Sequence, residues 1–543
     1  MPQTETEQLK KTSGWEPLRR PVFRNLWLAA LVSNLGSWMQ DTAGTWLMTS
    51  LTTSPLLIAL MQTAASLPAV LLAFPAGSIA DILDRRRLLI VWQTWMLVSV
   101  ALLSGLTLAG VISPWTLLLL TFLLSIGSAM NSPAWQAIFP ELVPRSELPD
   151  AISINSAGFN LARALGPALG GLTVAAFVST ITGASMAFLC NAVSFVAVIA
   201  VLYMWRRTPP FKSALPAERL LGSMRAGVRY LRHAPALQAI LVRTVLFTGF
   251  ASAAWALLAV VAQQDLHQGA MGYGILNGCM GLGAVFGAAS LPKVRKRFTE
   301  DAFVGWATMV FACTLAVLAF ERHFWIIVLS LIATGFAWTT ITSTLNVAVQ
   351  LSVPAWVQAR ALGIYQMVFL AGMALGSALW GYVAQRLSTP QSLLCAALGL
   401  LATLPLARRF HLLQGILPDL SPYALNRPAP QVVIEPNPED GPVLVTIEYQ
   451  ISETDYEEFT GAIHKLRSVR LRDGAMRWGV FRDTARPERV IETFVVDSWL
   501  EFLRARARMT ASDRLIRDRV WNFHQGDSPP VTSYMIYARE LSR

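Results

Sequence analysis

Twelve long runs of apolar residues occupy most of this sequence, and they limit the folds it can adopt. A helix needs about 20 apolar residues to cross a bilayer. Only 14% of the 543 residues are charged, whereas a soluble domain carries about 25%. The sequence therefore predicts an all-α membrane protein with twelve transmembrane helices, near residues 25–50, 55–80, 88–110, 115–138, 150–177, 183–205, 237–262, 271–292, 302–320, 324–350, 361–384 and 391–408.

Basic residues gather in alternate loops between these runs. One set of loops includes Arg85, Arg86 and Arg87, whereas the opposite set contains only Arg322 and Arg386. Because Lys and Arg are retained on the cytoplasmic side, we expect both termini to be cytoplasmic and the chain to lie in a bacterial inner membrane. The net charge of +11 has the same explanation, so we expect no nucleic-acid partner. The first twenty residues lack a signal-peptide pattern, and the first span is expected to serve as an uncleaved insertion signal.

An internal repeat at an offset of 210 residues divides the apolar region into two parts. Val143-Pro144 recurs as Val353-Pro354, and Gly166 falls on Gly376. Duplicated halves around a central site are common in secondary transporters. We therefore expect two six-helix pseudo-repeats, 21–205 and 237–410. A cytoplasmic tail (1–20) would precede them, and a central loop (206–236) with a basic amphipathic helix would join them.

The last quarter of the chain is soluble in character. A Pro-rich linker, 411–441, leads to strand and helix patterns over 442–541 in the order βαββαβ, with strands near 443–449, 475–483, 488–496 and 531–538 and helices over 453–470 and 498–522. This order is typical of a small α+β, ferredoxin-like domain. Because this domain follows a helix end that is expected to be cytoplasmic, we expect the domain to be cytoplasmic too. No catalytic set, metal-ligand spacing or Gly-rich phosphate loop appears, so we expect neither an enzyme nor a cofactor.

The loop after the second span carries a more specific pattern. Gly77, Ala80, Asp81, Arg85 and Arg86 match the loop signature of the major facilitator superfamily, whereas Ile82 and Asp84 depart from it. The sequence therefore resembles that superfamily over residues 20–410, which implies the major facilitator fold and a gating loop formed by Gly77, Asp81, Arg85 and Arg86. Alternatively, the arginines only set the topology and Asp81 only caps a helix.

Three phrases resemble one branch of the superfamily, the enterobactin-exporter-like or transmembrane secretion effector branch. They are Ser54-Pro55, the segment 84–87 and the segment 160–171. The C-terminal domain is similar to dimeric α/β-barrel modules found in this branch, which implies a homodimer through that domain. The branch implies export of a siderophore, secondary metabolite or drug.

Small residues recur along the fifth span. Gly158, Ala162, Gly166 and Gly170 are four residues apart and share one helix face, where they would allow another helix to pack closely. The segment 166–171, which includes Pro167, resembles the antiporter signature of drug exporters, and this resemblance favours export. Alternatively, the glycines serve only tight helix packing.

Two ionisable residues fall inside predicted spans. A charge at bilayer depth costs several kcal/mol unless it is paired or hydrated, so Asp41 and Arg163 are candidate functional groups. Our hypothesis is that both face a central cavity, with Asp41 carrying the proton and Arg163 acting as its counter-ion or as an anion anchor. The alternative is a static structural pair.

Polar and aromatic residues at helical spacing are candidates to line the substrate cavity. The same residues could instead hold helices together. The tryptophans among them favour an amphipathic or aromatic ligand. The set comprises Asn34, Trp38 and Thr45 in span one, Ser128, Ser132 and Gln136 in span four, Asn160 in span five, Thr244, Thr248 and Trp255 in span seven, and Trp338, Thr342 and Asn346 in span ten.

These patterns together predict a proton-coupled exporter of a small amphipathic molecule, working by alternating access. Its partners would be the substrate, protons and the lipid bilayer. An uptake permease of the same fold is the first alternative. A membrane sensor that signals through the C-terminal domain is the second.

Overall fold

The computed structural model describes residues 15–144, 146–205, 227–294, 299–412, 419–421, 432 and 436–538. They fall into two compact units. The first takes in Met1–Ala214, Arg243–Thr344 and Gln366–Arg409, and the second takes in Leu215–Val242, Leu345–Tyr365 and Phe410–Arg543. Residues 1–14, most of the central loop and much of the linker lie outside the described part, and so does the first part of the expected amphipathic helix.

The first six long helices begin where the sequence supplies helix-start signals. Pro occupies the first turn of α1, α2, α4 and α5, and the side chains of Ser54, Asp84 and Ser113 cap α2, α3 and α4. After the short η1 (Glu16–Arg19), the elements are α1 (Pro21–Leu51), α2 (Pro55–Ile82), α3 (Arg85–Leu108), α4 (Pro114–Leu142), α5 (Leu148–Ala175) and α6 (Thr180–Met204).

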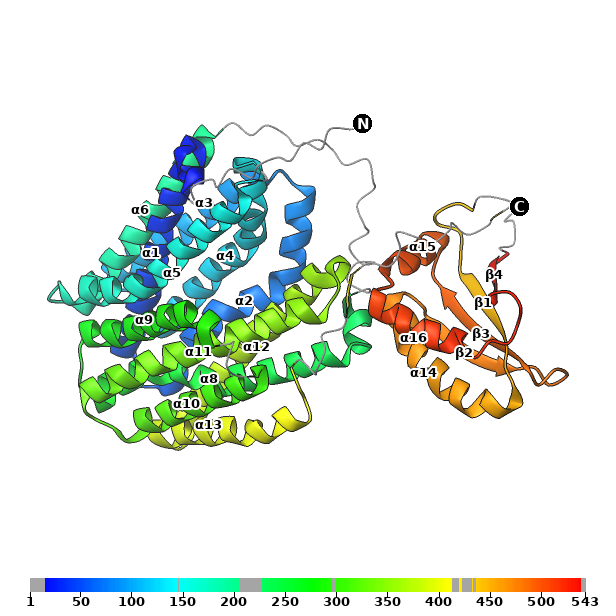
Figure 1. Cartoon of the computed structure of the whole chain (residues 1–543). Helices are drawn as coiled ribbons and strands as arrows, with labels where there is room; N and C mark the ends of the chain where they lie inside the picture. The colour runs from blue at the N-terminus through cyan, green and yellow to red at the C-terminus, as the bar shows by residue number, and fades with distance from the viewer. Residues whose placement is uncertain are drawn as a thin grey trace. The chain divides into compact units, whose positions relative to one another are not determined.

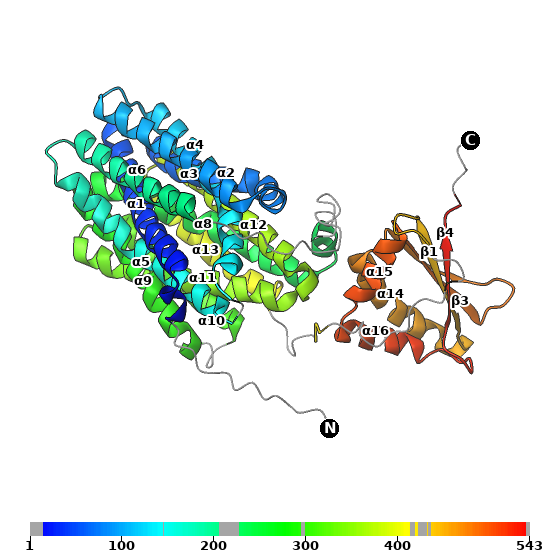
Figure 2. The same ribbon diagram turned by 90° about the horizontal axis from the view of Figure 1, so that it is seen from above.

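Six further helices make up the rest of the apolar region. They are α8 (Pro235–Val260), which continues into the π-helical η2 (Val261–Asp265), α9 (Ala270–Val294), α10 (Glu300–Phe320), α11 (Phe324–Ser352), α12 (Ala355–Arg386) and α13 (Thr389–Thr403), which is followed by η3 (Leu404–Arg408). Figure 1 shows α1–α6 in one bundle and α9–α13 in another, and Figure 2 gives the view turned by 90°. Each of the twelve expected spans coincides with one of these helices.

Ten helices of the described region are long and apolar enough to cross a membrane. The chain is therefore a multi-pass membrane protein. Helices α1 and α5 have 31 and 28 residues, long enough to cross, but they carry more polar residues and are not among the ten. They are the helices that contain Asp41 and Arg163.

Helix packing within the first unit brings α1 and α5 side by side. Helix α1 packs against α5 and α6, α2 against α4, and α3 against α4 and α6. Helix α5 also packs against α9, so it joins the first group of helices, α1–α6, to the second group, α8–α13. The two polar helices therefore lie where the two groups meet.

The C-terminal domain contains a four-stranded antiparallel sheet with the strand order β2-β3-β1-β4. Its elements are β1 (Val443–Gln450), η5 (Glu453–Asp455), α14 (Tyr456–Asp473), β2 (Arg477–Arg482), β3 (Arg489–Val496), α15 (Trp499–Arg508), α16 (Ala511–Trp521) and β4 (Val531–Ile536). The prediction of a single helix over 498–522 is wrong, because α15 and α16 are two separate helices. Thr510 and Asp513 form a capping box that starts a second helix there.

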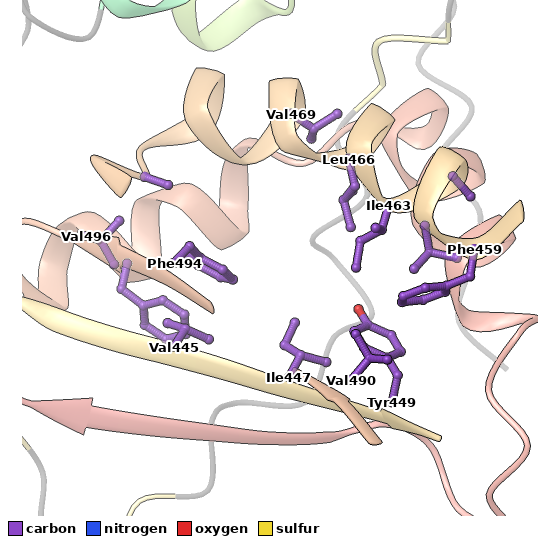
Figure 3. Packing of buried hydrophobic residues seen from close by; sticks show 14 of the residues in the cluster. Val445, Ile447, Tyr449, Phe459, Ile463, Leu466, Val469, Val490, Phe494 and Val496 are labelled. Atoms are coloured by element: carbon purple, nitrogen blue, oxygen red, sulfur yellow. The ribbon is translucent and has the colours of Figure 1, made fainter. Parts of the chain in front are cut away.

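The core of this domain lies between one face of the sheet and its helices (Figure 3). Along β1, every second residue from Val443 is buried, as expected for a strand with one covered face. Val445, Ile447 and Tyr449 pack with Phe459, Ile463 and Leu466 of α14. This core is separate from the membrane helices and uses residues of the domain alone.

Candidate functional site

The first turns of α1 and α5 are tied together at one end of the bundle. Arg20 donates two hydrogen bonds to Glu147, at 2.8 and 2.7 Å, and these bonds lower the pKa of Glu147. Further along, the Trp27 indole N–H donates to the carbonyl oxygen of Ile154 at 3.2 Å. These contacts set the register of α1 along α5.

The glycines of α5 lie against α1. A Cβ added at Gly166 would collide with the Cβ of Trp38, and one at Gly170 would lie 2.6 Å from the Met39 carbonyl oxygen. Gly158 faces the Trp27 ring in the same way, and Pro167 is buried beside these glycines. On another face of α5, Gly171 approaches Gly274 of α9. The small residues thus let α5 approach two helices at backbone distance.

Asp41 lies on α1 beyond this contact and is exposed. Among the described residues it forms no ion pair and accepts no hydrogen bond, and the side chain of Tyr273 on α9 interacts with both Asp41 and Thr45. An ionisable side chain that lies within a membrane helix and has no fixed partner is suited to exchange a proton.

The residue next to Asp41 is held rigidly. Gln40 is buried and accepts a hydrogen bond from the side-chain amide of Asn191 on α6, at 2.5 Å. Asn191 in turn accepts one from the Ser194 hydroxyl at 3.1 Å. This buried chain fixes the rotation of α1 about its axis, and therefore the direction in which Asp41 points. The sequence analysis missed Gln40 and Asn191, whose only signal was their polarity inside apolar spans.

Arg163 is half-buried on α5. Its backbone carbonyl lies close to Gly281 of α9. Among the described residues, Arg163 and Asp41 do not form an ion pair, and both the counter-ion interpretation and the static pair stay predictions. The role of Arg163 as an anion anchor stays a prediction.

The two groups of helices contact each other around the end where α1 finishes and α2 begins. Trp46 of α1 stacks on Tyr273 of α9, with ring centroids 5.8 Å apart. Beyond it, Gln263 and Gln264 donate to the carbonyl oxygens of Thr49 and Thr53, at 3.1 and 3.4 Å. Asp41 therefore lies next to a contact that joins the first group of helices to the second.

Closer to the middle of the bundle, a further bond joins the two groups. The Thr63 hydroxyl of α2 donates to the Ala374 carbonyl oxygen of α12 at 2.8 Å.

The tryptophans predicted in spans seven and ten lie in an aromatic cluster. The rings of Trp255 and Trp338 are 4.3 Å apart, and Phe247, Phe311 and Phe369 surround Trp338 at 5.5 to 6.3 Å. Trp338 is 5% exposed. Thr244 and Thr248 are fully buried on α8. Their predicted role in lining a cavity stays a prediction.

The remaining predicted cavity residues are more accessible. Ser128, Ser132 and Gln136 are exposed along α4, as is Asn160 on α5, which donates to the Ser156 carbonyl oxygen. Asn34, Trp38, Thr45, Thr342 and Asn346 are half-buried.

The gating-loop arginines bind other helices of the first group. Arg85 forms a salt bridge with Glu141 at 2.9 Å and also donates to the Ala137 carbonyl oxygen. Arg86 donates to the carbonyl oxygens at the end of α6. These arginines therefore tie α3 to the ends of α4 and α6. Gly77 is half-buried in α2, and the side chain of Asp81 lies outside the described part.

A buried carboxylate organises the C-terminal domain. Glu492 of β3 is completely buried and accepts hydrogen bonds from the Tyr449 hydroxyl, the Arg470 guanidinium and the Trp478 indole at 2.9 to 3.3 Å. Because it is closed to solvent and fully bonded, this cluster serves the fold. The described residues contain no group of side chains that would hold a metal ion.

Known proteins include relatives that are similar in sequence to this chain. The multidrug efflux pump Tap of Mycolicibacterium fortuitum is 24% identical over 381 residues, which cover 69% of this chain and 91% of the pump. The staphyloferrin A transporter of Staphylococcus aureus is 29% identical over 170 residues, 31% of this chain and 42% of that protein.

Solved structures share the fold of the membrane region. The nucleoside transporter NupG matches with a TM-score of 0.57 and 14% identity, covering 72% of this chain and 99% of its own. A bacterial homologue of the human lysosomal transporter Spinster matches with a TM-score of 0.57 and 15% identity, covering 72% and 98%. The family model described as transmembrane secretion effector matches residues 12–541. The chain therefore belongs to the transmembrane secretion effector family of major facilitator superfamily transporters.

Proposed function

We propose that this protein is a proton-coupled exporter of a small amphipathic molecule such as a siderophore, secondary metabolite or drug. The observation that carries the proposal is the environment of Asp41 in a membrane helix. This residue is exposed, has no ion-pair partner among the described residues, and lies next to the contact between the two groups of helices. Protonation of this carboxyl removes the charge that is costly at bilayer depth. Its protonation state can therefore favour one arrangement of the two groups over another.

Alternating access would come from rocking of two six-helix halves, α1–α6 and α8–α13, about the region between them. The basic loops support cytoplasmic termini and a location in the bacterial inner membrane. In that orientation, the contacts from Trp46 to Gln264 close the outer end of the bundle. The efflux pump named above supports export. The name of the staphyloferrin A transporter states no direction, and uptake is the alternative.

The C-terminal domain would be cytoplasmic in the same orientation. Its strand order and its helices on one sheet face support a ferredoxin-like plan. The other face presents Phe481, Val531 and Met535, each at least half exposed. We propose that this face forms a homodimer, which cross-linking of the full-length protein at graded dilution would test.

Proton release from inside-out vesicles tests the transport proposal. A pH-sensitive dye is enclosed, the interior is made acidic, and siderophores and amphipathic drugs are added in turn. The expected result is a substrate-triggered loss of internal protons that falls by at least about tenfold in Asp41→Asn. The matched control is Asp527→Asn, which makes the same change at an exposed residue outside the membrane.

Full proton release by Asp41→Asn would remove Asp41 from the mechanism. If no compound triggers release from vesicles that hold folded protein, export by proton exchange is wrong. Uptake, uniport or sensing through the C-terminal domain would then take its place.

A further inference from the structure

One compact unit of the structure combines three segments that are far apart in the sequence. It contains the end of the central loop with the start of α8, the end of α11 with the start of α12, and the whole C-terminal domain. The end of the central loop is helical over residues 227–232 and is called the loop-end helix here. It leads directly into α8, so this unit brings together the segments from which two membrane helices begin.

Two arginines of the domain stack on aromatic rings from the other two segments. The Arg508 guanidinium lies 4.6 Å from the ring centroid of Trp356 in α12, and that of Arg472 lies 5.6 Å from Tyr230 in the loop-end helix. Tyr230 and Trp356 also touch each other edge to face, at 5.7 Å. Cation–π contacts strengthen when they are desolvated, and Tyr230 and Arg508 are 2% and 7% exposed.

An ion network crosses the same contact. Glu501 of α15 forms two salt bridges, one with Arg229 of the loop-end helix at 2.8 Å and one with Arg508 of its own helix at 2.5 Å. Burial by itself would raise the pKa of Glu501, but hydrogen bonds and positive charge from Arg508 and Arg229 lower it. The carboxylate is therefore held ionised between one arginine of the domain and one of the loop-end helix.

The domain holds its own arginines in position without help from the other segments. Arg472 is bound by Asp473 and Asp513 at 3.0 and 2.6 Å, and Arg508 donates to the Asp473 carbonyl oxygen at 2.8 Å. The apolar core of the domain uses none of the other segments. A rigid, prearranged surface of this kind binds with little loss of side-chain freedom.

We propose that the C-terminal domain is an intramolecular docking module. It binds the loop-end helix and the start of α12 through Arg472, Glu501 and Arg508. The ligand of this surface is a helix pair that presents Tyr230, Trp356 and Arg229. Docking joins the segment that enters α8 to the one that enters α12, so these two helix starts move together. The proposal does not depend on the direction of transport or on its coupling ion.

Hydrogen exchange on the full-length protein in lipid nanodiscs tests the docking. The variant Arg229→Gln/Tyr230→Leu removes the loop-end contribution and leaves the Arg508–Glu501 pair of the domain intact. Amides of α15 and of residues 227–232 should exchange at least about tenfold faster, while those of β1 and β3 stay protected. Trp356→Leu, at the start of α12, should have the same effect on α15.

The matched control is Arg489→Gln, which removes an arginine from another ion pair of the same domain, with Glu448. It should leave α15 exchange unchanged. Unchanged exchange in α15 in both test variants would overturn the proposal. Exchange that rises equally in β1 and β3 would overturn it too, because the loop-end helix would then be part of the domain's fold rather than a docked segment.

Discussion

Neighbouring residues in α1 have opposite environments in this protein. Gln40 is buried and bonded to Asn191, whereas Asp41 is exposed and has no ion-pair partner among the described residues. A polar pair satisfied inside the membrane domain stabilises one rotation of a helix. A carboxyl without a fixed partner is free to change its protonation state. The structural and the chemical roles are therefore divided between adjacent side chains.

Asn191→Ala should destabilise the protein by about 1 kcal/mol, because Gln40 loses its buried hydrogen-bond donor. Thermal unfolding in detergent measures the change, and the proton-release assay should show a weaker response because α1 is held less firmly. Asn522→Ala, at an exposed residue in the C-terminal domain, serves as the control. A melting temperature equal to that of the unaltered protein would show that the bond contributes nothing.

The C-terminal domain should lose stability as the pH rises through about 6. Burial raises the pKa of Asp473 from 3.8 to about 6, despite the nearby Arg472. The folded form therefore binds this proton more tightly than the unfolded form. The resulting stabilisation is fully present below about pH 4 and is lost as the pH rises through the folded pKa. Between about pH 4 and a pH above the folded pKa, the free energy of unfolding should fall by about 1 to 3 kcal/mol.

Hydrogen exchange of the β1 and β3 amides, corrected for intrinsic rates, measures this loss. Comparison with Asp473→Asn isolates the contribution from that of other carboxyls, since the variant has no proton to release. Identical pH profiles for the two proteins would contradict the prediction.

Among the elements, α5 packs closely against one helix of its own group, α1, and one helix of the other group, α9. Its glycines face α1 along one side, and Gly171 faces α9 along another. Backbone atoms lie opposite several of these positions, and backbone moves less readily than a side chain. The packing therefore depends on the absence of a side chain at particular positions rather than on general apolarity.

Gly170→Ala and Gly105→Ala should change stability in opposite directions. The added Cβ at Gly170 would lie 2.6 to 3.1 Å from backbone atoms of Met39, which should cost about 1 to 3 kcal/mol. At Gly105 in α3 it would meet nothing within 4 Å, and the higher helix propensity of Ala should stabilise by up to about 1 kcal/mol. Melting temperatures of the two variants in detergent test the pair. A stabilised Gly170→Ala would show that α1 and α5 have room to separate.

For the whole molecule, the contacts between the two groups of helices define one conformation of a protein proposed to alternate. Those from Trp46 to Gln264 would have to break for the opposite arrangement to form. Thr53 and Gln264 are both exposed and are bonded to each other. They are therefore suitable positions at which to lock the conformation.

A cross-link between cysteines introduced at Thr53 and Gln264 should lower transport by at least about tenfold. The four native cysteines are first replaced by Ala, because three of them are exposed. A short bifunctional thiol reagent then joins the two positions in vesicles. The single-cysteine variants treated with the same reagent should keep their activity. Undiminished transport by the cross-linked protein would mean that this end need not open.

The sequence determined the features that depend on local composition. Long apolar runs must form helices in a bilayer because each backbone polar group needs a partner. Each expected span accordingly coincides with a helix, and ten helices of the described region are long and apolar enough to cross a membrane. The sequence also predicted a strand near 443–449, and β1 spans Val443–Gln450. The cost of charge at bilayer depth made Asp41 and Arg163 candidate functional groups, and their roles stay predictions.

Tertiary structure decided which of these groups meet. The sequence left open whether Arg163 is the counter-ion of Asp41 or an anion anchor, because the distance between side chains on two packed helices depends on the register of those helices. It did not indicate that Asn191 bonds Gln40 or that Tyr273 lies beside Asp41, because contacts between distant segments leave no periodic trace in one sequence. The docking surface of the C-terminal domain likewise depends on contacts between distant segments. Arg229, Trp356 and Glu501 are ordinary residues of three separate segments, and only packing gives them a shared role.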